Sequence, residues 1–174
     1  MAMLQDLERT TTERLLLRRI QEGDLDAVFA IHADPETSRF DPSGPLRSMD
    51  AARELMELWL EDWARHGVGY WVVERLDAPG TVVGFSGLRH KQLQGQPVLN
   101  LAYRFSPRSW GSGYATEVAR VALALARKHI PHIPVVAIID LENAPSLRVA
   151  ERLGMRRDRV IGLEGVANAV YLAE

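Results

Sequence analysis

The glycine-containing segment Arg108–Glu117 (RSWGSGYATE) constrains this chain more than any other feature of its sequence. A run of β-forming residues precedes the segment, and an amphipathic helical pattern over residues 113–129 follows it. Gly111 and Gly113 allow backbone N–H groups to turn toward a ligand, and the helix N-terminus adds free donors and a positive dipole end. The segment therefore predicts a site for an anion such as a pyrophosphate. A turn that merely connects strand and helix is the alternative.

The pattern of secondary structure changes at this segment. Before it, three strand-like runs are separated by short turns, which predicts antiparallel hairpins. After it, strands and helices alternate. The predicted order is β-α-α-β-β-β-α-β-α-β-β, an α+β domain with a mixed central sheet flanked by helices. The expected strands are 13–20, 70–74, 81–88, 97–105, 135–139, 157–161 and 168–172; helices open at Asp24 and Ser48 and cover 113–129 and 144–153; Pro79-Gly80 and Gln94-Gly95 are expected turns.

The composition excludes several classes of protein. The 174 residues are the size of one domain, 1–174, of which 1–12 are expected to be a flexible N-terminal segment. A net charge of -2 disfavours a nucleic-acid binder, which is usually basic. Cysteine is absent, so disulfides, thiolate metal sites and a cysteine nucleophile are excluded, and no metal is expected. No signal core and no apolar run near the ~18 residues of a membrane span are present, which predicts a cytoplasmic protein without a membrane partner.

A dinucleotide-binding fold is one interpretation of the glycine segment. Its fingerprint needs a third glycine, but Thr116 stands at that place. Asp140 follows the next strand and satisfies the requirement for an acidic residue ~20 positions further on. However, a dinucleotide fold has its loop after the first strand, whereas three antiparallel-looking strands precede the loop here. This interpretation is therefore disfavoured.

The motifs resemble those of the GNAT superfamily of acetyltransferases. Arg108-x-x-Gly111-x-Gly113 resembles the Arg/Gln-x-x-Gly-x-Gly/Ala signature of that superfamily, and the extension to Glu117 resembles its Rim-type branch. Asn143-x-x-Ser146, followed by the turn at Gly154-Met155, resembles a second motif of the branch, and residues 13–18 (ERLLLR) resemble its first strand. The resemblance covers residues 12–172 and implies the GNAT fold.

This resemblance implies acetyl-CoA as co-substrate and assigns the residues that bind it. The loop amides are expected to hold the pyrophosphate, and the strand before the loop is expected to splay from its neighbour and pair with the pantetheine arm. Asn143 is expected to bond the pantetheine or acetyl end, with Ser146 near the sulfur. The implied cofactor-binding residues are Phe105, Ser106, Arg108, Gly111, Ser112, Gly113, Tyr114, Ala115, Asn143 and Ser146. The adenosine 3′-phosphate needs cations, for which Lys128, Arg148 and Arg152 are candidates; solvated surface charges are the alternative for each.

The implied chemistry is a direct attack of an amine on the acetyl carbonyl in a ternary complex. A backbone N–H of Phe105 or Ser106 is expected to hold the carbonyl oxygen. Ser146 is expected to pass a proton to the leaving thiolate; a capping role at the start of its helix is the alternative. Many relatives have a carboxylate at the position of Asn100, and its absence leaves His90 as a candidate base, against a surface or structural role.

The acceptor is expected to bind at the loop after the first helix. Glu36, Arg39 and Phe40 are the candidate substrate-binding residues there. An α-amine, with a pKa of ~7.7–8.0, needs less help from a base than lysine at ~10.4, so peptide N-termini and small amines are favoured. A homodimer is compatible with the resemblance. The alternatives are an acyl-CoA-binding sensor domain without catalysis and, less favoured, a nucleotide-dependent oxidoreductase.

Overall fold

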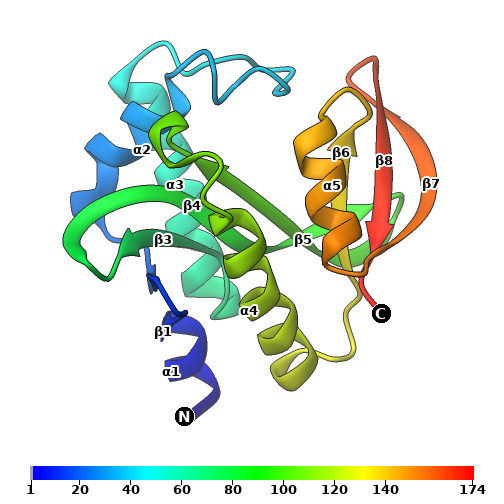
Figure 1. Ribbon diagram of the computed structural model, residues 1–174, viewed down its shortest axis with the longest axis horizontal. Coiled ribbons are helices and arrows are strands. Elements are labelled where there is room, and N and C mark those ends of the chain that lie inside the picture. Colours follow the sequence, from blue (N-terminus) through cyan, green and yellow to red (C-terminus); the bar gives the residue numbers. More distant parts are fainter. Residues whose placement is uncertain (1) are drawn as a thin grey trace.

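A computed structural model describes residues 2–174 and contains one mixed sheet of eight strands flanked by helices (Figure 1). The strand order is β1-β2-β3-β4-β5-β6-β8-β7. The helices are α1 (Ala2–Glu8), α2 (Leu25–His32), α3 (Met49–His66), α4 (Tyr114–His129) and α5 (Ala144–Arg152). The strands are β1 (Arg9–Thr11), β2 (Leu15–Arg19), β3 (Tyr70–Arg75), β4 (Ala78–Leu93), β5 (Gln96–Phe105), β6 (Val135–Asp140), β7 (Arg156–Leu163) and β8 (Val166–Leu172).

From β2 onward, the α-helices and strands follow the predicted order. Every neighbouring pair in the sheet is antiparallel except β5 and β6, which are parallel. A parallel pair needs a crossover, and α4 supplies it. The predicted caps of α3 are confirmed: Ser48 accepts a hydrogen bond from the Ala51 N–H, and Gly67 ends the helix at φ 67°.

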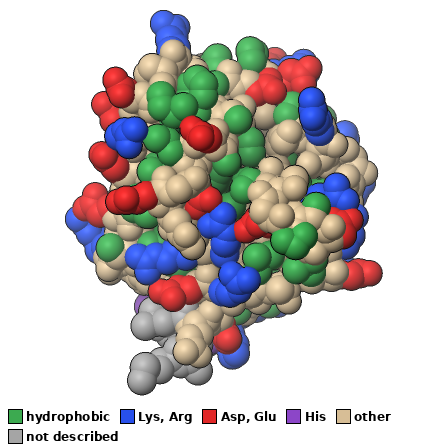
Figure 2. Space-filling view, turned by 90° about the vertical axis from the view of Figure 1, so that its left-hand side faces the viewer, with side chains coloured by type: hydrophobic (Ala, Val, Ile, Leu, Met, Phe, Trp, Pro, Cys, Tyr) green, Lys and Arg blue, Asp and Glu red, His purple; other side chains and the backbone are tan. Residues whose placement is uncertain are grey.

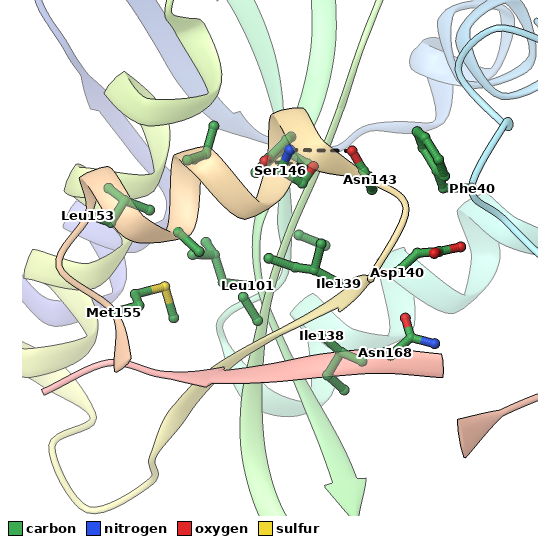
Figure 3. A pocket seen from close by; sticks show the side chains of 15 residues that line it. Phe40, Leu101, Ile138, Ile139, Asp140, Asn143, Ser146, Leu153, Met155 and Asn168 are labelled. Carbon is green, nitrogen blue, oxygen red and sulfur yellow. Dashed lines mark hydrogen bonds between the residues drawn. The ribbon is translucent and has the colours of Figure 1, made fainter. Parts of the chain in front are cut away.

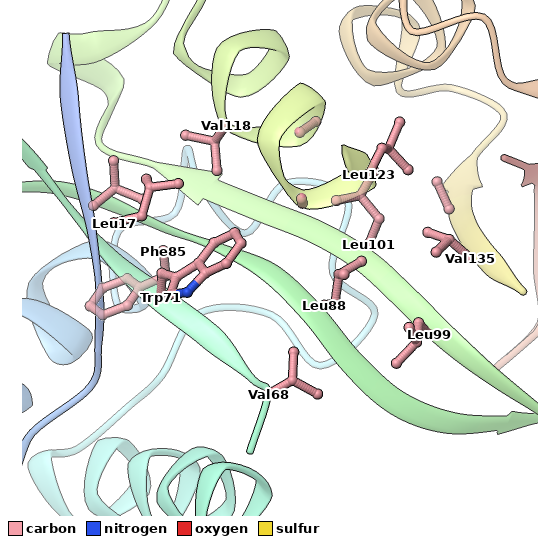
Figure 4. Packing of buried hydrophobic residues seen from close by; sticks show 14 of the residues in the cluster. Leu17, Val68, Trp71, Phe85, Leu88, Leu99, Leu101, Val118, Leu123 and Val135 are labelled. Carbon is pink, nitrogen blue, oxygen red and sulfur yellow. The ribbon is translucent and has the colours of Figure 1, made fainter. Parts of the chain in front are cut away.

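The core lies on both faces of the central strands. Figure 4 shows Val118 and Leu123 of α4 above the strands and α3 below them. The small residues of α4 let that helix approach the sheet closely, and Ala119 and Ala122 are fully buried. Trp59 and Trp63 of α3 are 4% and 1% exposed, so the prediction that these tryptophans pack in the core is confirmed. Burial of such aromatic side chains is the largest apolar contribution per residue.

The N-terminal segment differs from its prediction. Residue 1 lies outside the described residues, but residues 2–11 form α1 and β1 rather than a flexible segment. Leu7 is 1% exposed, its carbonyl accepts a hydrogen bond from the Trp71 indole N–H, and β1 pairs with β2. The segment is mostly polar, so its docking depends on one apolar anchor and backbone pairing, which leave no periodic pattern in the sequence.

The predicted turn at Pro79-Gly80 is wrong. The hairpin turns at Leu76 and Asp77, and Pro79 and Gly80 lie inside β4, where the β3–β4 register shifts. Gly80 has a φ of 85°, and its N–H donates to Glu74 Oε1 at 2.6 Å. A glycine with positive φ is as suited to a bulge as to a turn, so the dipeptide alone did not locate the reversal.

A charged network ties β2 to β3 and to the start of α2. Arg18 donates to both carboxylate oxygens of Asp24, at 2.9 and 2.7 Å, and to Glu74. The three side chains are only 16%, 9% and 9% exposed. Breaking a buried ion pair from one side leaves its partner charge uncompensated.

We expect Arg18→Met to lower the free energy of unfolding by about 3 kcal/mol, because two buried carboxylates then lose their cation. Urea denaturation followed by circular dichroism measures this change. Arg65→Met is the matched control, since Arg65 and Glu61 form an exposed pair on α3; we expect it to cost less than about 0.5 kcal/mol. Equal effects of the two substitutions would contradict the conclusion that Arg18 compensates two buried carboxylates.

Candidate active site

β5 and β6 separate soon after they meet. Only Leu99 with Val135 and Asn100 with Val136 are in register, although both strands continue for several residues. Ser106 N donates to Val83 O on the β4 side, and Leu99 N donates to Pro134 O on the β6 side. Because hydrogen-bonding direction alternates along an antiparallel strand, the odd-numbered residues Leu101, Tyr103 and Phe105 direct their backbone groups toward the opened edge.

Two cavities lie at this opening. The narrow cavity, about 160 Å³, is bounded by β5, β6 and α5. The wide cavity, about 390 Å³, lies against Asn100 and Arg104, which alternate with the core-facing residues of β5 and so face the other side of the sheet. The two cavities share Phe40, Ile138, Asp140 and Asn168. In Figure 3, Phe40, Asp140 and Asn168 gather at one end of the narrow cavity, and Leu153 and Met155 lie at the other.

A hydroxyl pair stands in the narrow cavity. Tyr103 of β5 donates through its hydroxyl to Ser146 Oγ of α5 at 2.9 Å. Because Ser146 Oγ accepts this bond, its own proton is left to donate elsewhere. Burial raises the pKa of Tyr103 against the smaller opposing effect of the hydrogen bond to Ser146, so the phenol stays protonated and keeps donating. The motifs did not identify Tyr103, whose only sequence signal is its place in β5, two residues before Phe105.

Asn143 caps α5. Its Oδ1 accepts a hydrogen bond from Ser146 N at 3.3 Å, drawn as a dashed line in Figure 3. The capping role that sequence offered as the alternative for Ser146 thus belongs to Asn143, and the Ser146 hydroxyl faces the cavity. The remaining hydrogen-bonding capacity of the Asn143 amide lies beside the same cavity.

The glycine loop has the geometry of an anion site. Gly111 and Gly113 have φ of 79° and 81°, and a side-chain carbon at Gly111 would meet nothing within 4 Å. Gly113 is the N-cap of α4, with no side chain bonded over the helix end. The exposed Arg108 forms no hydrogen bond or ion pair with the described residues 2–174. Because no side chain of these residues caps α4, the N–H groups of its first turn are open to an anion, and Arg108 can add a positive charge.

Two side chains of the β1–β2 turn, those of Thr12 and Arg14, hold this loop. Glu117, in the first turn of α4, accepts hydrogen bonds from the Thr12 hydroxyl and from Arg14 Nε, the latter at 2.8 Å. Arg14 Nη2 donates to Ser112 O at 2.7 Å, and the guanidinium lies 4.6 Å from the centre of the Tyr114 ring. Burial raises the pKa of Glu117, and the bonds from Thr12 and Arg14 outweigh it, so the carboxylate keeps its charge.

Arg14 is a cation beside the loop that the motifs did not identify. Lys128, one of the three sequence candidates for the adenosine 3′-phosphate, lies at the far end of α4, roughly 20 Å from the loop at 1.5 Å per residue. It pairs instead with Asp6 at 2.8 Å. Arg14 therefore joins Arg108 as a cation beside the glycine loop.

At the end of β5, one of the two backbone N–H groups predicted to hold the acetyl carbonyl oxygen is free to do so. Ser106 N is already bonded to Val83 O at 2.8 Å, so the expectation that it holds a carbonyl oxygen is wrong. Phe105 N faces the opened edge. The Trp110 indole donates to Phe105 O at 2.9 Å and ties the loop to the strand, while the residue is 53% exposed.

The predicted acceptor residues are only partly gathered at the cavities. Phe40 lines both, whereas Glu36 and Arg39 are exposed, with Arg39 stacked over Phe40 at 5.3 Å. The wide cavity also contains Asp41, which pairs with Arg104 at 2.9 Å. His90 stacks on His66 of α3 at 4.0 Å and is absent from the walls of both cavities. The structure therefore does not bring His90 to Ser146.

His32 lies behind the Arg104–Asp41 pair, against Trp59 and Phe85. Burial, followed by the charge of Arg104, lowers its pKa to about 4. In the unfolded chain the His32 imidazole therefore binds a proton near pH 6.5, whereas in the folded chain it binds one only near pH 4. Stability is retained above pH 6.5 and falls as the pH drops through this window.

We expect acidification from pH 7 to pH 4 to remove about 3 kcal/mol of unfolding free energy through His32. Urea denaturation at intervals across this range measures the loss. His32→Gln is the matched variant: its stability at pH 7 is lower, but the part of the slope due to this residue disappears. A slope unchanged in His32→Gln would show that His32 is not responsible.

Acidic and basic side chains are interspersed on the face shown in Figure 2, without a large patch of one sign. Within residues 2–174, no three His, Cys, Asp or Glu side chains are grouped as a metal site. In the same range, no helix combines the length and apolarity that a bilayer crossing requires.

One family model and several known proteins are similar to this chain. Residues 14–156 match the family model described as Acetyltransferase (GNAT) domain. The uncharacterized protein YkkB of Bacillus subtilis is 30% identical over 164 residues, which cover 94% of each chain. An acetyltransferase structure from Agrobacterium tumefaciens has a TM-score of 0.82 at 25% identity and covers 95% of this chain and 94% of its own. A spermidine N-acetyltransferase from Vibrio cholerae, solved with CoA and spermine, has a TM-score of 0.70 at 20% identity and covers 91% and 92%.

Proposed function

Because the chain belongs to the GNAT family of acetyltransferases, we propose that it moves the acetyl group of acetyl-CoA directly to a primary amine in a ternary complex. The observation that carries this proposal is the edge of β5 from Leu101 to Phe105, which pairs with no strand among residues 2–174 and leads into the glycine loop. An extended amide chain can pair with such an edge as an added strand. The pantetheine arm has two amides, and the pyrophosphate at its end would meet the N-terminus of α4.

The residues of the narrow cavity fit the thioester end. Phe105 N is the backbone donor on the opened edge that remains for the acetyl oxygen, where charge develops as the amine attacks. The Ser146 hydroxyl, polarised by Tyr103, would give its proton to the departing sulfur. Asn143 would hold the pantetheine end with its free amide N–H groups. The residues proposed to bind the coenzyme are Phe105, Arg108, Gly111, Ser112, Gly113, Tyr114, Ala115, Asn143 and Ser146, together with Arg14.

The amine would reach the thioester from the wide cavity, past Phe40 and Asp140. Asn100 stands in that cavity and donates through Nδ2 to the Tyr70 hydroxyl at 3.3 Å, so this strand position supplies no carboxylate base. An acceptor that is partly neutral at pH 7 fits such a site better than a lysine side chain. We therefore favour peptide α-amines and small amines, which agrees with the resemblance of residues 113–117 and 143–146 to the Rim-type branch.

Two measurements test the proposal. Calorimetric titration with acetyl-CoA, CoA and NAD is expected to give binding of the first two alone. Release of free thiol from acetyl-CoA, followed over a panel of peptides, polyamines and amino acids, is expected to require an acceptor. Tight acetyl-CoA binding without thiol release on any acceptor would favour the sensor function, and binding of NAD alone would reject both.

A further inference from the structure

The charges of the wide cavity bear on the identity of the amine. Resting on the function proposed above, we infer that the acceptor is an extended primary amine that carries an anionic group about 10 Å from its reacting nitrogen. The inference follows from the placement of Lys91, Asp140 and Asn168 in one cavity.

The inner end of the cavity offers hydrogen-bond acceptors to an ammonium group. Asp140 and Asn168 belong to the wall that both cavities share, and they face each other across the β6–β8 ladder. Asp140 Oδ1 accepts the Glu142 N–H at 2.8 Å, and Asn168 Nδ2 donates to Val166 O at 3.0 Å. The second carboxylate oxygen of Asp140 and the amide oxygen of Asn168 remain for the amine.

The other end of the cavity carries a cation. Lys91 of β4 lines the wide cavity and is without an ion-pair partner among residues 2–174. Arg104, the second cation in the wall, is neutralised by Asp41. Glu164, the remaining anion of the wall, lies in the β7–β8 turn beyond Asn168, at the Asp140 end. At its own end of the cavity, Lys91 therefore presents a positive charge to a molecule that binds there. Lys91 is exposed to solvent, so its ammonium group is accessible to a ligand that enters the cavity.

The two ends are well separated along the strands. Lys91 is level with Val98 of β5, Asn100 is level with Val136, and Asp140 lies four residues further along β6. Six register positions correspond to roughly 20 Å. The four-carbon stem of the lysine and the reach of the ligand groups span part of this length. About 10 Å, or three residues of extended chain, remain for the acceptor.

This arrangement disfavours a polyamine. A chain with positive charges along its length would place one of them against Lys91, and like charges in a partly enclosed site repel. A peptide N-terminus with an acidic side chain at its third residue satisfies both ends, and so does a linear amino acid of the same length. The two sources share one chemistry and are distinguished by the panel of acceptors below.

The test compares matched acceptors with saturating acetyl-CoA. The peptides are Ser-Ala-Asp-Ala, Ser-Ala-Asn-Ala and Ser-Ala-Lys-Ala, each with an amidated C-terminus; 8-aminooctanoate and spermidine complete the panel. For the unmodified protein we expect kcat/KM to be about fivefold higher for the aspartate peptide than for the asparagine peptide. Activity on 8-aminooctanoate at least equal to that on the aspartate peptide would identify the small-molecule source.

Substitution of Lys91 separates a charge effect from a structural one. Lys91→Met is expected to bring the aspartate-to-asparagine ratio to about one, and Lys91→Glu to favour the lysine peptide instead. Lys128→Met is the matched control, because Lys128 is the other lysine of the sequence and lies at the far end of α4. It is expected to leave the ratio unchanged. Thermal denaturation of each variant verifies the fold.

The outcomes separate this inference from the proposed function. Thiol release that is equal for the aspartate and asparagine peptides, fastest with spermidine, or unaltered in ratio by Lys91→Met would overturn the inference while the acetyltransferase proposal stands. Absence of release with every acceptor, spermidine included, would reject the proposed function and the inference with it.

Discussion

Gly113→Asp is expected to raise the dissociation constant for acetyl-CoA at least 100-fold in a protein that still folds. Gly113 is the N-cap of α4 at φ 81°, and its N–H belongs to the group that would face the pyrophosphate. A side-chain carbon there would lie 3.6 Å from Arg14 Nη2. An aspartate would therefore place a carboxylate where the phosphates bind and would compete for the neighbouring cation.

Calorimetric titration measures this loss, with two controls. Gly113→Asn keeps the shape of the substitution without its charge, so the difference between the two variants reports electrostatics. Gly95→Asp tests the backbone cost alone, because Gly95 has a φ of 80° in the β4–β5 turn, with nothing within 4 Å of an added carbon. A Gly113→Asp variant that binds acetyl-CoA normally would mean that the pyrophosphate lies elsewhere.

Ser146→Ala is expected to lower kcat about 100-fold with little change in acetyl-CoA affinity, since positioned proton transfer contributes about 10²- to 10⁴-fold. Tyr103→Phe is expected to lower kcat by a smaller factor, about tenfold, because it removes the bond to Ser146 Oγ but leaves the proton donor. The raised pKa of Tyr103 keeps its phenol protonated, so this pair predicts no loss of activity from its titration below pH 10.

Steady-state thiol release at saturating acetyl-CoA and acceptor measures kcat for these variants, and calorimetry measures binding separately. Ser146 N is bonded to Asn143 Oδ1, so each variant also needs a thermal denaturation to verify the cap of α5. If Ser146→Ala retained full activity while Tyr103→Phe lost it, the phenol itself would be the donor to sulfur. Full activity in both variants would remove the hydroxyl pair from the mechanism.

Much of the fold could be predicted because periodicity and turn residues agree along most of the chain. The amphipathic pattern of α4, the hairpin at Gln94-Gly95 and the helix caps at Ser48 and Gly67 reflect local chemistry, and all four are present in the structure. Local sequence patterns did not predict the structure of segments that are held by contacts with residues far away in the chain. The N-terminal segment is held by its contact with Trp71, 64 residues away from Leu7.

The candidate site shows the same division. The glycine loop and the Asn143–Ser146 motif are contiguous and could be recognised from sequence. Arg14 and Tyr103 act across the fold: Arg14 reaches a carbonyl 98 residues away, and Tyr103 reaches a hydroxyl 43 residues away. Tyr103 belongs to none of the recognised motifs, and the segment 13–18 that contains Arg14 indicated only a strand, so the three-dimensional arrangement is needed to reveal both contacts. His90, the candidate base offered by the sequence, is packed against the imidazole of His66 instead.

The brief contact between β5 and β6 also bears on how the molecule responds to its ligand. The last part of the chain, from β6 through β8, joins the rest of the sheet by a parallel ladder with two register positions. A ligand that fills the opening between β5 and β6 contacts both parts and restrains their relative motion. Amide hydrogens in β6 and β8 are then expected to exchange far more slowly with acetyl-CoA present, whereas those in β2 and β3 change little.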